Sequence, residues 1–255
     1  MTSRSQVLVA AEIALVALTV AVVISLERLF TDLSFLSDVL LMALGSHLIA
    51  GVCRRAEISM ALATPISGLS MVVLGTAIFY PDASALIIPT PETVDALGAD
   101  LRDAWSVFSD DAAPVPPLRG FVVTTSVLVW YGVFLADWAA FRLRSPLEAV
   151  APATAVFVFA SLLGVDRNSI AHGTLFAAGV GAVLLAMRME RQVREEVWVA
   201  DSAGRGISTT ARVGLIAGAC AVLLGAAAAP QLPGADGDPL VDVTDLDNGP
   251  QTRSV

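Results

Sequence analysis

Several residue types on which chemistry at protein sites depends are scarce in this chain. It has two cysteines and two histidines in 255 residues. Two cysteines are too few for a disulfide framework or a CxxC-type metal site. The histidines, His47 and His172, are too far apart to form an HExxH zinc motif, and neither a GxGxxG nor a Walker A motif is present. The sequence therefore predicts no enzyme active site and no cofactor in this chain.

Charged residues are also scarce, at 15%, and lysine is absent, so that all fifteen basic residues are arginine. The net charge of -9 comes mainly from the loop after residue 80 and from the carboxyl-terminal tail, which argues against a nucleic-acid partner. Hydrophobic residues make up 56% of the chain and the mean hydropathy is +0.75. Soluble domains are nearer half apolar and roughly a quarter charged, so the expected partner is membrane lipid.

Seven apolar runs are long enough to cross a bilayer as helices, because about 20 residues at about 1.5 Å each span its hydrocarbon core. The first run follows Arg4 and has no small-residue cleavage site, so it is expected to be a retained span and not a signal peptide. The sequence predicts an all-α, polytopic transmembrane bundle over residues 1–230 and a linker-like tail over 231–255. The predicted spans cover residues 7–26, 35–53, 58–80, 121–140, 147–164, 170–187 and 213–229.

The arginines predict the orientation of this bundle, since cytoplasmic loops are enriched in basic residues. With the amino terminus in the cytoplasm and the carboxyl terminus outside, the inner segments contain Arg4, Arg54, Arg55, Arg142, Arg144, Arg188, Arg191, Arg194, Arg205 and Arg212. The outer segments contain only Arg28, Arg102, Arg119, Arg167 and Arg253. The bias predicts a multi-pass protein of the plasma membrane with an extracytoplasmic tail.

The outer loop, residues 81–120, contains a pattern typical of a short amphipathic helix. Thr90 suits an N-cap, Pro91 a first helical turn and Glu92 the positive end of the helix dipole. Apolar residues then recur at helical spacing at Val94, Leu97, Leu101, Trp105 and Phe108. This helix could lie on the outer membrane surface or on the spans as a surface helix, or it could be a platform for a substrate or partner.

Two further local patterns concern the inner side. Ser145 and Glu148 fit a capping box that opens the fifth span. The sixth span continues as a charged stretch over residues 188–196 and is expected to extend as a helix into the cytoplasm. Cys53 is expected to be a buried packing thiol.

Ionisable residues inside spans are candidates for function, because an unpaired charge at the bilayer centre costs at least about 2.5 kcal/mol. Asp137 is near Arg142 and Arg144, so interfacial pairing accounts for it, and an interfacial location accounts for His172. Glu12 and His47 are expected on neighbouring spans, where they could form either a structural polar contact or a proton relay. The sequence does not fix their relative depth.

The last sixty residues resemble the amino-terminal membrane domain of bacterial, especially actinobacterial, transglutaminase-like membrane proteins. The resemblance rests on WVAD at residues 198–201, QLPGA at 231–235, PLVD at 239–242 and GPQTR at 249–253. It implies an extracytoplasmic transglutaminase-like domain with a Cys, His, Asp triad after the tail, a role at the cell envelope, and a neighbouring MoxR-type ATPase. No residue here matches a triad position, and the chain stops before that domain.

Two hypotheses follow. The first is a membrane anchor or scaffold that positions an extracytoplasmic transglutaminase-like (cysteine protease-like) module, which is not present in this chain and is either encoded downstream or lost. The second is a small multi-pass transporter or channel-like protein that uses Glu12, His47 and the spans containing Pro65 and Pro152, since interrupted helices line transporter sites. Prolines also occur in transmembrane helices that merely kink, so these two residues do not decide between the hypotheses.

Overall fold

The computed structural model describes residues 4–85, 87–110 and 113–196. In these residues the chain is an all-α bundle, and its only strands are the two-residue β1 (Ser84–Ala85) and β2 (Ile88–Pro89), which pair antiparallel. Six helices are long and apolar enough to cross a membrane, which indicates a membrane protein. They correspond to six of the seven predicted spans, whereas the seventh, residues 213–229, lies outside the described residues.

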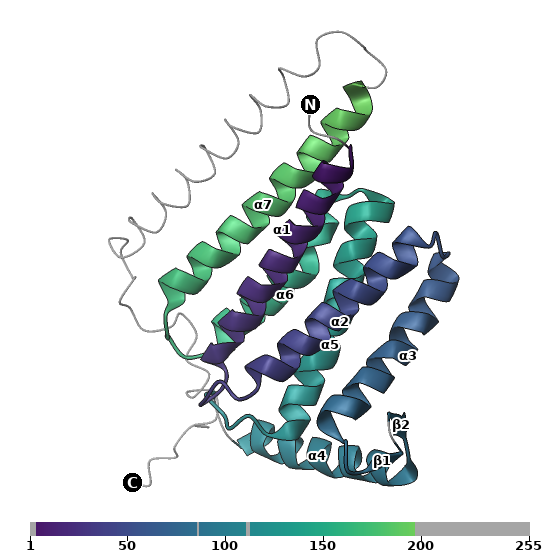
Figure 1. Ribbon diagram of the computed structural model, residues 1–255. Coiled ribbons are helices and arrows are strands. Elements are labelled where there is room, and N and C mark those ends of the chain that lie inside the picture. Colours follow the sequence, from purple (N-terminus) through teal and green to yellow (C-terminus); the bar gives the residue numbers. More distant parts are fainter. Residues whose placement is uncertain (1–3, 86, 111–112, 197–255) are drawn as a thin grey trace, which may run out of the picture.

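The helix boundaries fall close to the ends of the apolar runs (Figure 1). The last helix continues to Glu196, as predicted for the charged stretch after the sixth span. The division between a membrane domain and a tail near residue 230 stays a prediction. The six apolar helices are α1 (Arg4–Ser25), α2 (Leu36–Arg55), α3 (Met60–Phe79), α5 (Arg119–Trp138), α6 (Pro146–Leu163) and α7 (Ser169–Glu196).

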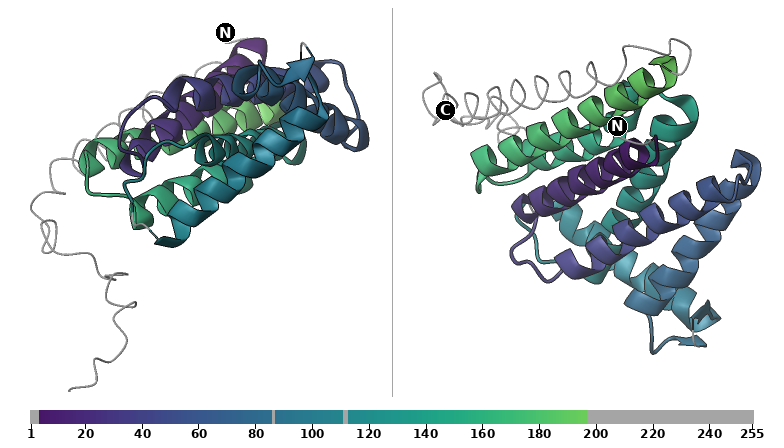
Figure 2. Two further views of the ribbon diagram at one scale, coloured as in Figure 1. Left: turned by 90° about the horizontal axis from the view of Figure 1, so that it is seen from below. Right: turned by 45° about the horizontal axis from the view of Figure 1, so that its top comes forward.

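Consecutive spans run in opposite directions, with α1 lying along α7 and α2 along α5 (Figures 1 and 2). Small residues let these helices approach closely. A Cβ atom added at Gly179 on α7 would lie 3.0 Å from the Leu18 side chain on α1. Close van der Waals packing of this kind drives helix association in lipid, where the hydrophobic effect between helices is absent.

A buried polar chain joins three of the helices. The Ser46 hydroxyl on α2 donates to the backbone carbonyl of Trp130 on α5 at 2.7 Å. The Trp130 indole in turn donates to the Ser67 hydroxyl on α3 at 3.0 Å. All three residues are fully buried, so the chain of bonds fixes the relative depth of α2, α3 and α5.

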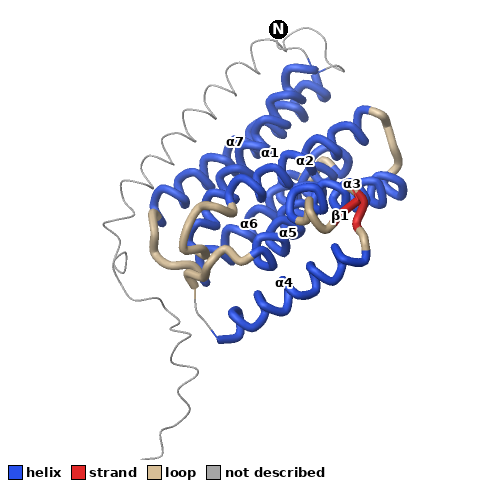
Figure 3. Tube along the Cα trace, turned by 60° about the horizontal axis from the view of Figure 1, so that its bottom comes forward, coloured by secondary structure: helices blue, strands red, loops and turns tan. Residues whose placement is uncertain are grey.

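The predicted amphipathic helix is confirmed as α4 (Pro91–Asp110). The backbone amide of Thr93 donates to the Thr90 hydroxyl at 3.3 Å, and the Thr90 amide donates to the Thr93 hydroxyl at 3.0 Å, which caps the first turn. The helix lies across the end of the bundle at which α3 ends and α5 begins (Figure 3). It therefore covers one end of the spans and does not run among them.

The predicted capping box before α6 does not form. Ser145 is the N-cap in an extended conformation, and Pro146 opens the helix, but the Ser145 side chain makes no capping hydrogen bond. In a capping box the backbone amide of Ser145 would donate to the Glu148 carboxylate. Here it donates instead to the Ala139 carbonyl at 3.0 Å. The reason is the π-helical turn Ala139–Leu143 at the end of α5, which the left-handed Arg144 closes just before Ser145.

Candidate functional site

A cluster of charged side chains joins three helices at the end of the bundle where α2 ends. The Arg54 guanidinium on α2 contacts the Glu12 carboxylate on α1 at 2.7 Å and the Asp137 carboxylate on α5 at 3.2 Å. Arg55 contacts Glu12 from the exposed side, also at 2.7 Å. The Arg54 guanidinium also lies over the Phe141 ring, 3.9 Å from its centre. We call Glu12, Arg54, Arg55 and Asp137 the arginine cluster.

Asp137 makes its ion pair with an arginine other than the two that lie near it in the sequence. The sequence favours Arg142 or Arg144, but the contact is with Arg54, which is 83 residues away in the chain. The buried Asp137 carboxylate lies on the side of α5 that faces α2. Asp137 is therefore bound across the helix interface and not to the loop that follows its own helix.

The two predicted site residues each have another partner. Glu12 binds the two arginines, whereas the His47 Nε2 atom lies 3.0 Å from the Thr19 hydroxyl of α1. Thr19 is seven residues from Glu12, which is about 10 Å along a helix. His47 therefore contacts α1 two turns away from the Glu12 carboxylate. The role predicted for Glu12 and His47 stays a prediction.

A second polar group lies at the opposite end, where α1 meets the start of α7. His172 is buried, with its Nε2 atom 3.3 Å from the Glu27 carboxylate, so it connects the start of α7 to the turn after α1. The Arg28 guanidinium is also buried and donates to the Val165 carbonyl at 2.9 Å and the Ser161 hydroxyl at 3.2 Å. These contacts connect the turn after α1 with the connection between α6 and α7.

Asp100 connects α4 to the bundle. The Tyr80 hydroxyl at the end of α3 donates to the Asp100 carboxylate at 2.9 Å, and Arg119 at the start of α5 lies 3.9 Å from the same oxygen. A Cβ atom added at Gly120 would overlap the Asp100 carbonyl oxygen and lie 2.8 Å from the Ala104 side chain. A glycine is therefore required where α4 crosses the first turn of α5.

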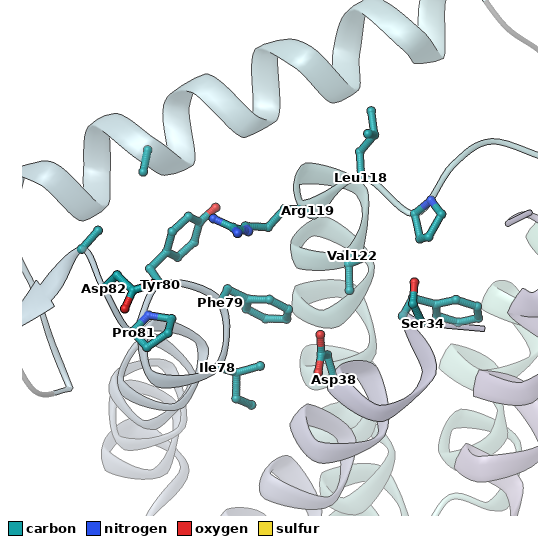
Figure 4. Close-up of a pocket in the computed structure, with 14 residues that line it drawn as sticks. Ser34, Asp38, Ile78, Phe79, Tyr80, Pro81, Asp82, Leu118, Arg119 and Val122 are labelled. Atoms are coloured by element: carbon teal, nitrogen blue, oxygen red, sulfur yellow. The ribbon is translucent and has the colours of Figure 1, made fainter. Parts of the chain in front are cut away.

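A cavity of about 630 Å³ opens beside this contact, between the start of α2, the end of α3 and the start of α5 (Figure 4). Its wall combines apolar residues such as Phe79 and Val122 with the carboxylates of Asp38 and Asp82 and the guanidinium of Arg119. These charged groups could hold a polar ligand. The lining contains no cysteine or histidine, so the cavity has neither the nucleophile nor the general base of a Cys–His site.

Side chains of the types that bind metal ions are also present in the described part of the chain. No group of three or more His, Cys, Asp or Glu side chains there is placed to hold a metal ion. Cys53 is a buried free thiol, as predicted, and Cys220 lies outside the described residues. The polar clusters found in these residues connect helices, and none of them assembles a catalytic constellation.

One protein-family model matches most of the sequence. The model of the TgpA N-terminal domain matches residues 17–254. The chain belongs to the TgpA N-terminal domain family. This confirms the resemblance to the amino-terminal region of transglutaminase-like proteins, and that region is distinct from the catalytic transglutaminase-like core. No curated protein and no solved structure matches significantly.

Sequence reasoning missed the contacts that connect the TgpA N-terminal domain helices to one another. Arg54 and Arg28 look like ordinary loop arginines at the ends of apolar runs, and Asp100 looks like one of several acids on α4. Asp100 gave only a weak signal, because on the helix it falls about 60° beyond Leu97, at the border between the apolar and the polar side. Arg54 and Arg28 gave no comparable signal.

Proposed function

We propose that this chain is the membrane anchor of a transglutaminase-like module that lies outside the cytoplasm and is not part of this sequence. The observation that carries the proposal is the extent of the family match, which begins within α1, includes the other five apolar helices and continues through the tail to residue 254. The family is defined as the amino-terminal domain of a larger kind of protein. A polytopic bundle followed by a tail suits the attachment of another module.

The contacts at the two ends of the bundle support the proposed orientation. Among the arginines whose side chains the structure describes, six lie at the end with the arginine cluster and four lie at the opposite end. At the second end, Arg28 is bound to Val165 and Ser161, and Arg119 lies beside Asp100. Basic residues mark the cytoplasmic side, so we assign the arginine cluster to the cytoplasm and α4 to the outer side. The six are Arg54, Arg55, Arg142, Arg144, Arg188 and Arg191, and the four are Arg28, Arg102, Arg119 and Arg167.

The interior of the bundle favours an anchor over a transporter. A cavity among α1, α5 and α6 has a volume of only about 30 Å³ and is lined mainly by apolar residues, including Pro152. This is room for about one water molecule. Glu12 is bound by two arginines and His47 by Thr19, so the proposed relay residues act in helix packing. A neighbouring MoxR-type ATPase as a partner is a further expectation that rests on the resemblance alone.

The anchoring role can be tested by fusing a transglutaminase-like module after Val255 and expressing the fusion in bacteria. The module should sediment with membranes, stay there after a high-salt wash, and be cleaved by protease added outside spheroplasts. A matched fusion in which a cleavable signal peptide replaces residues 1–230 should be released in soluble form. A module that is protected from external protease would contradict the proposal.

The transporter alternative is tested by two substitutions in the full chain reconstituted in vesicles. If the chain is an anchor, the unmodified protein should carry no proton flux above that of empty vesicles, and Glu12→Gln and His47→Ala should leave this result unchanged. A flux that the unmodified chain supports and both folded variants lose would contradict the anchor proposal.

A further inference from the structure

The outer helix α4 has one side that is bound to the bundle. Thr93 and Ala104 on this side are buried, and Asp100 contacts Tyr80 and Arg119. These residues recur at intervals of four and seven, so they share one face of a helix with 3.6 residues per turn. This face fixes how α4 is rotated about its own axis.

Next to the bound face is a row of large apolar side chains that nothing in the described residues covers. Val94, Leu101, Trp105 and Phe108 are between 41% and 69% exposed. At 3.6 residues per turn they fall within an arc of roughly 60°. The Trp105 and Phe108 rings lie side by side, with their centres 5.8 Å apart. We call these four residues the apolar stripe.

The remaining side of α4 is polar and exposed. It contains Glu92, Asp95, Arg102 and Asp103, so its acids outnumber its single base. The helix thus has three sides in order around its axis: one bound to protein, one apolar and one charged. A helix at the edge of a bundle needs these three surfaces where protein, lipid and water meet.

The six spans place lipid beside this helix. Their exposed leucines, for example Leu48, Leu69 and Leu162, are between 66% and 75% exposed, and hydrocarbon is the environment that accommodates such surfaces on helices long enough to cross a membrane. Because α4 crosses the helix ends (Figure 3), it lies at the depth of the headgroups. Ile87 and Ile88, which lie just before α4 in the chain, are also exposed.

We propose that the apolar stripe of α4 inserts into the headgroup region of the outer leaflet and fixes the depth and tilt of the bundle. An interfacial helix buries its apolar face roughly 5–10 Å into the boundary between headgroups and acyl chains, and Trp is enriched at this level. The acidic side of α4 gains nothing from anionic lipid, so insertion rests on apolar contact and takes place in uncharged, zwitterionic lipid. The inference rests on the membrane-spanning bundle of the proposed function.

The observations favour lipid over a docked protein. A stable protein interface takes about 20–30 residues on each side, whereas the stripe offers four residues in a single row. The acids on the adjacent face of α4 would also face those of a second copy. A narrow row beside a charged face is suited to a lipid boundary.

Site-specific fluorescent labels on the full chain in phosphatidylcholine vesicles test this inference. In a Cys53→Ala, Cys220→Ala background, an environment-sensitive dye is attached after Trp105→Cys and, separately, after Phe108→Cys, which serves if the first variant does not fold. Asp103→Cys on the polar side of α4 is the matched control. Leu69→Cys on α3 reports the membrane core. Each label is quenched by lipid that carries a nitroxide near the headgroup and by aqueous iodide.

We expect the labels at positions 105 and 108 to be quenched several-fold more by nitroxide lipid than the label at 103, and several-fold less by iodide. Equal iodide quenching at 105 and 103 would place the stripe in water and overturn the inference. Protection at 105 from both quenchers would show a protein contact and would also overturn it. Either result, with position 69 still protected from iodide, would leave the proposed anchor intact, whereas iodide quenching at position 69 would contradict both proposals.

Discussion

Arg54 on α2 and Asp137 on α5 make a side-on contact through two hydrogen bonds. The Nη2 atom lies 3.2 Å from Oδ1, and the Nε atom lies 3.4 Å from Oδ2. The Asp137 side chain is only 8% exposed. A carboxylate so buried depends on its cation, because an uncompensated charge in a protein interior is costly. Since Arg54 also binds Glu12, one guanidinium holds α1, α2 and α5 in register.

Arg54→Ala should therefore destabilise the bundle strongly. The expected loss is about 3 kcal/mol, because the buried Asp137 carboxylate loses its principal cation. The measurement is the free energy of unfolding in detergent micelles, followed by circular dichroism. Arg55→Ala is the matched control. The Arg55 side chain is 61% exposed and also binds Glu12, and an exposed ion pair contributes less than about 1 kcal/mol.

The double variant Arg54→Ala, Asp137→Asn should recover part of the lost stability, since a neutral amide needs no cation. If Arg54→Ala lowered the free energy of unfolding as little as Arg55→Ala does, the buried ion pair would not hold the helices together.

Gly120→Ala should loosen α4 from the bundle. The added methyl group would overlap the Asp100 carbonyl and the Ala104 side chain, and overpacking of this kind costs roughly 1–3 kcal/mol. Protease susceptibility of the 81–120 loop in the folded protein measures the effect. Gly173→Ala is the control, because a Cβ atom there meets nothing within 4 Å. Equal protease resistance of the two variants would mean that α4 does not pack on α5 as described.

Tyr80→Phe should remove one of the bonds that hold α4. The loss of the hydroxyl that donates to Asp100 is expected to cost about 1 kcal/mol, and it should also raise the protease susceptibility of the loop. Tyr131→Phe changes a more exposed tyrosine on α5 and should leave the loop as resistant as before. A greater effect of the Tyr131 variant would argue against the assigned contact.

Arg28→Ala should separate α1 and α6 at the end of the bundle opposite the arginine cluster. The buried guanidinium donates to Val165 and Ser161, and hydrogen bonds that involve a charged group contribute about 1.5–3 kcal/mol each. Thermal unfolding in detergent should shift to a lower midpoint by several degrees. Arg167→Ala, which alters an exposed arginine in the same region, should not shift it. Matching midpoints for the two variants would contradict a structural role for Arg28.

The sequence predicted the helices well because each depends on local information. The apolar runs mark α1, α2, α3, α5, α6 and α7 within a few residues, and Thr90 with the periodic residues after it marks α4. Local information is also why the capping box failed. Ser145 and Glu148 have the residue types and spacing of a capping box, but the Ser145 amide donates to the Ala139 carbonyl of the preceding π-helical turn.

The contacts between helices could not be predicted, since they depend on relative depth. In the structure Glu12 pairs with Arg54, and His47 pairs with Thr19. Pairing Glu12 with His47 instead would require α1 and α2 to shift along each other by about two turns. Hydropathy fixes the ends of a span only to within a few residues, which is half of that shift. Asp137 shows the same problem, because two arginines close in sequence looked like better partners than one 83 residues away.

The most direct test of the anchor proposal is the side of the membrane on which the tail lies. A phosphatase reporter that is active only outside the cytoplasm can be fused to the chain after Arg205 and, separately, after Asp242. The account predicts an inactive fusion after Arg205 and an active fusion after Asp242. The reverse pattern would place the tail in the cytoplasm and contradict the account.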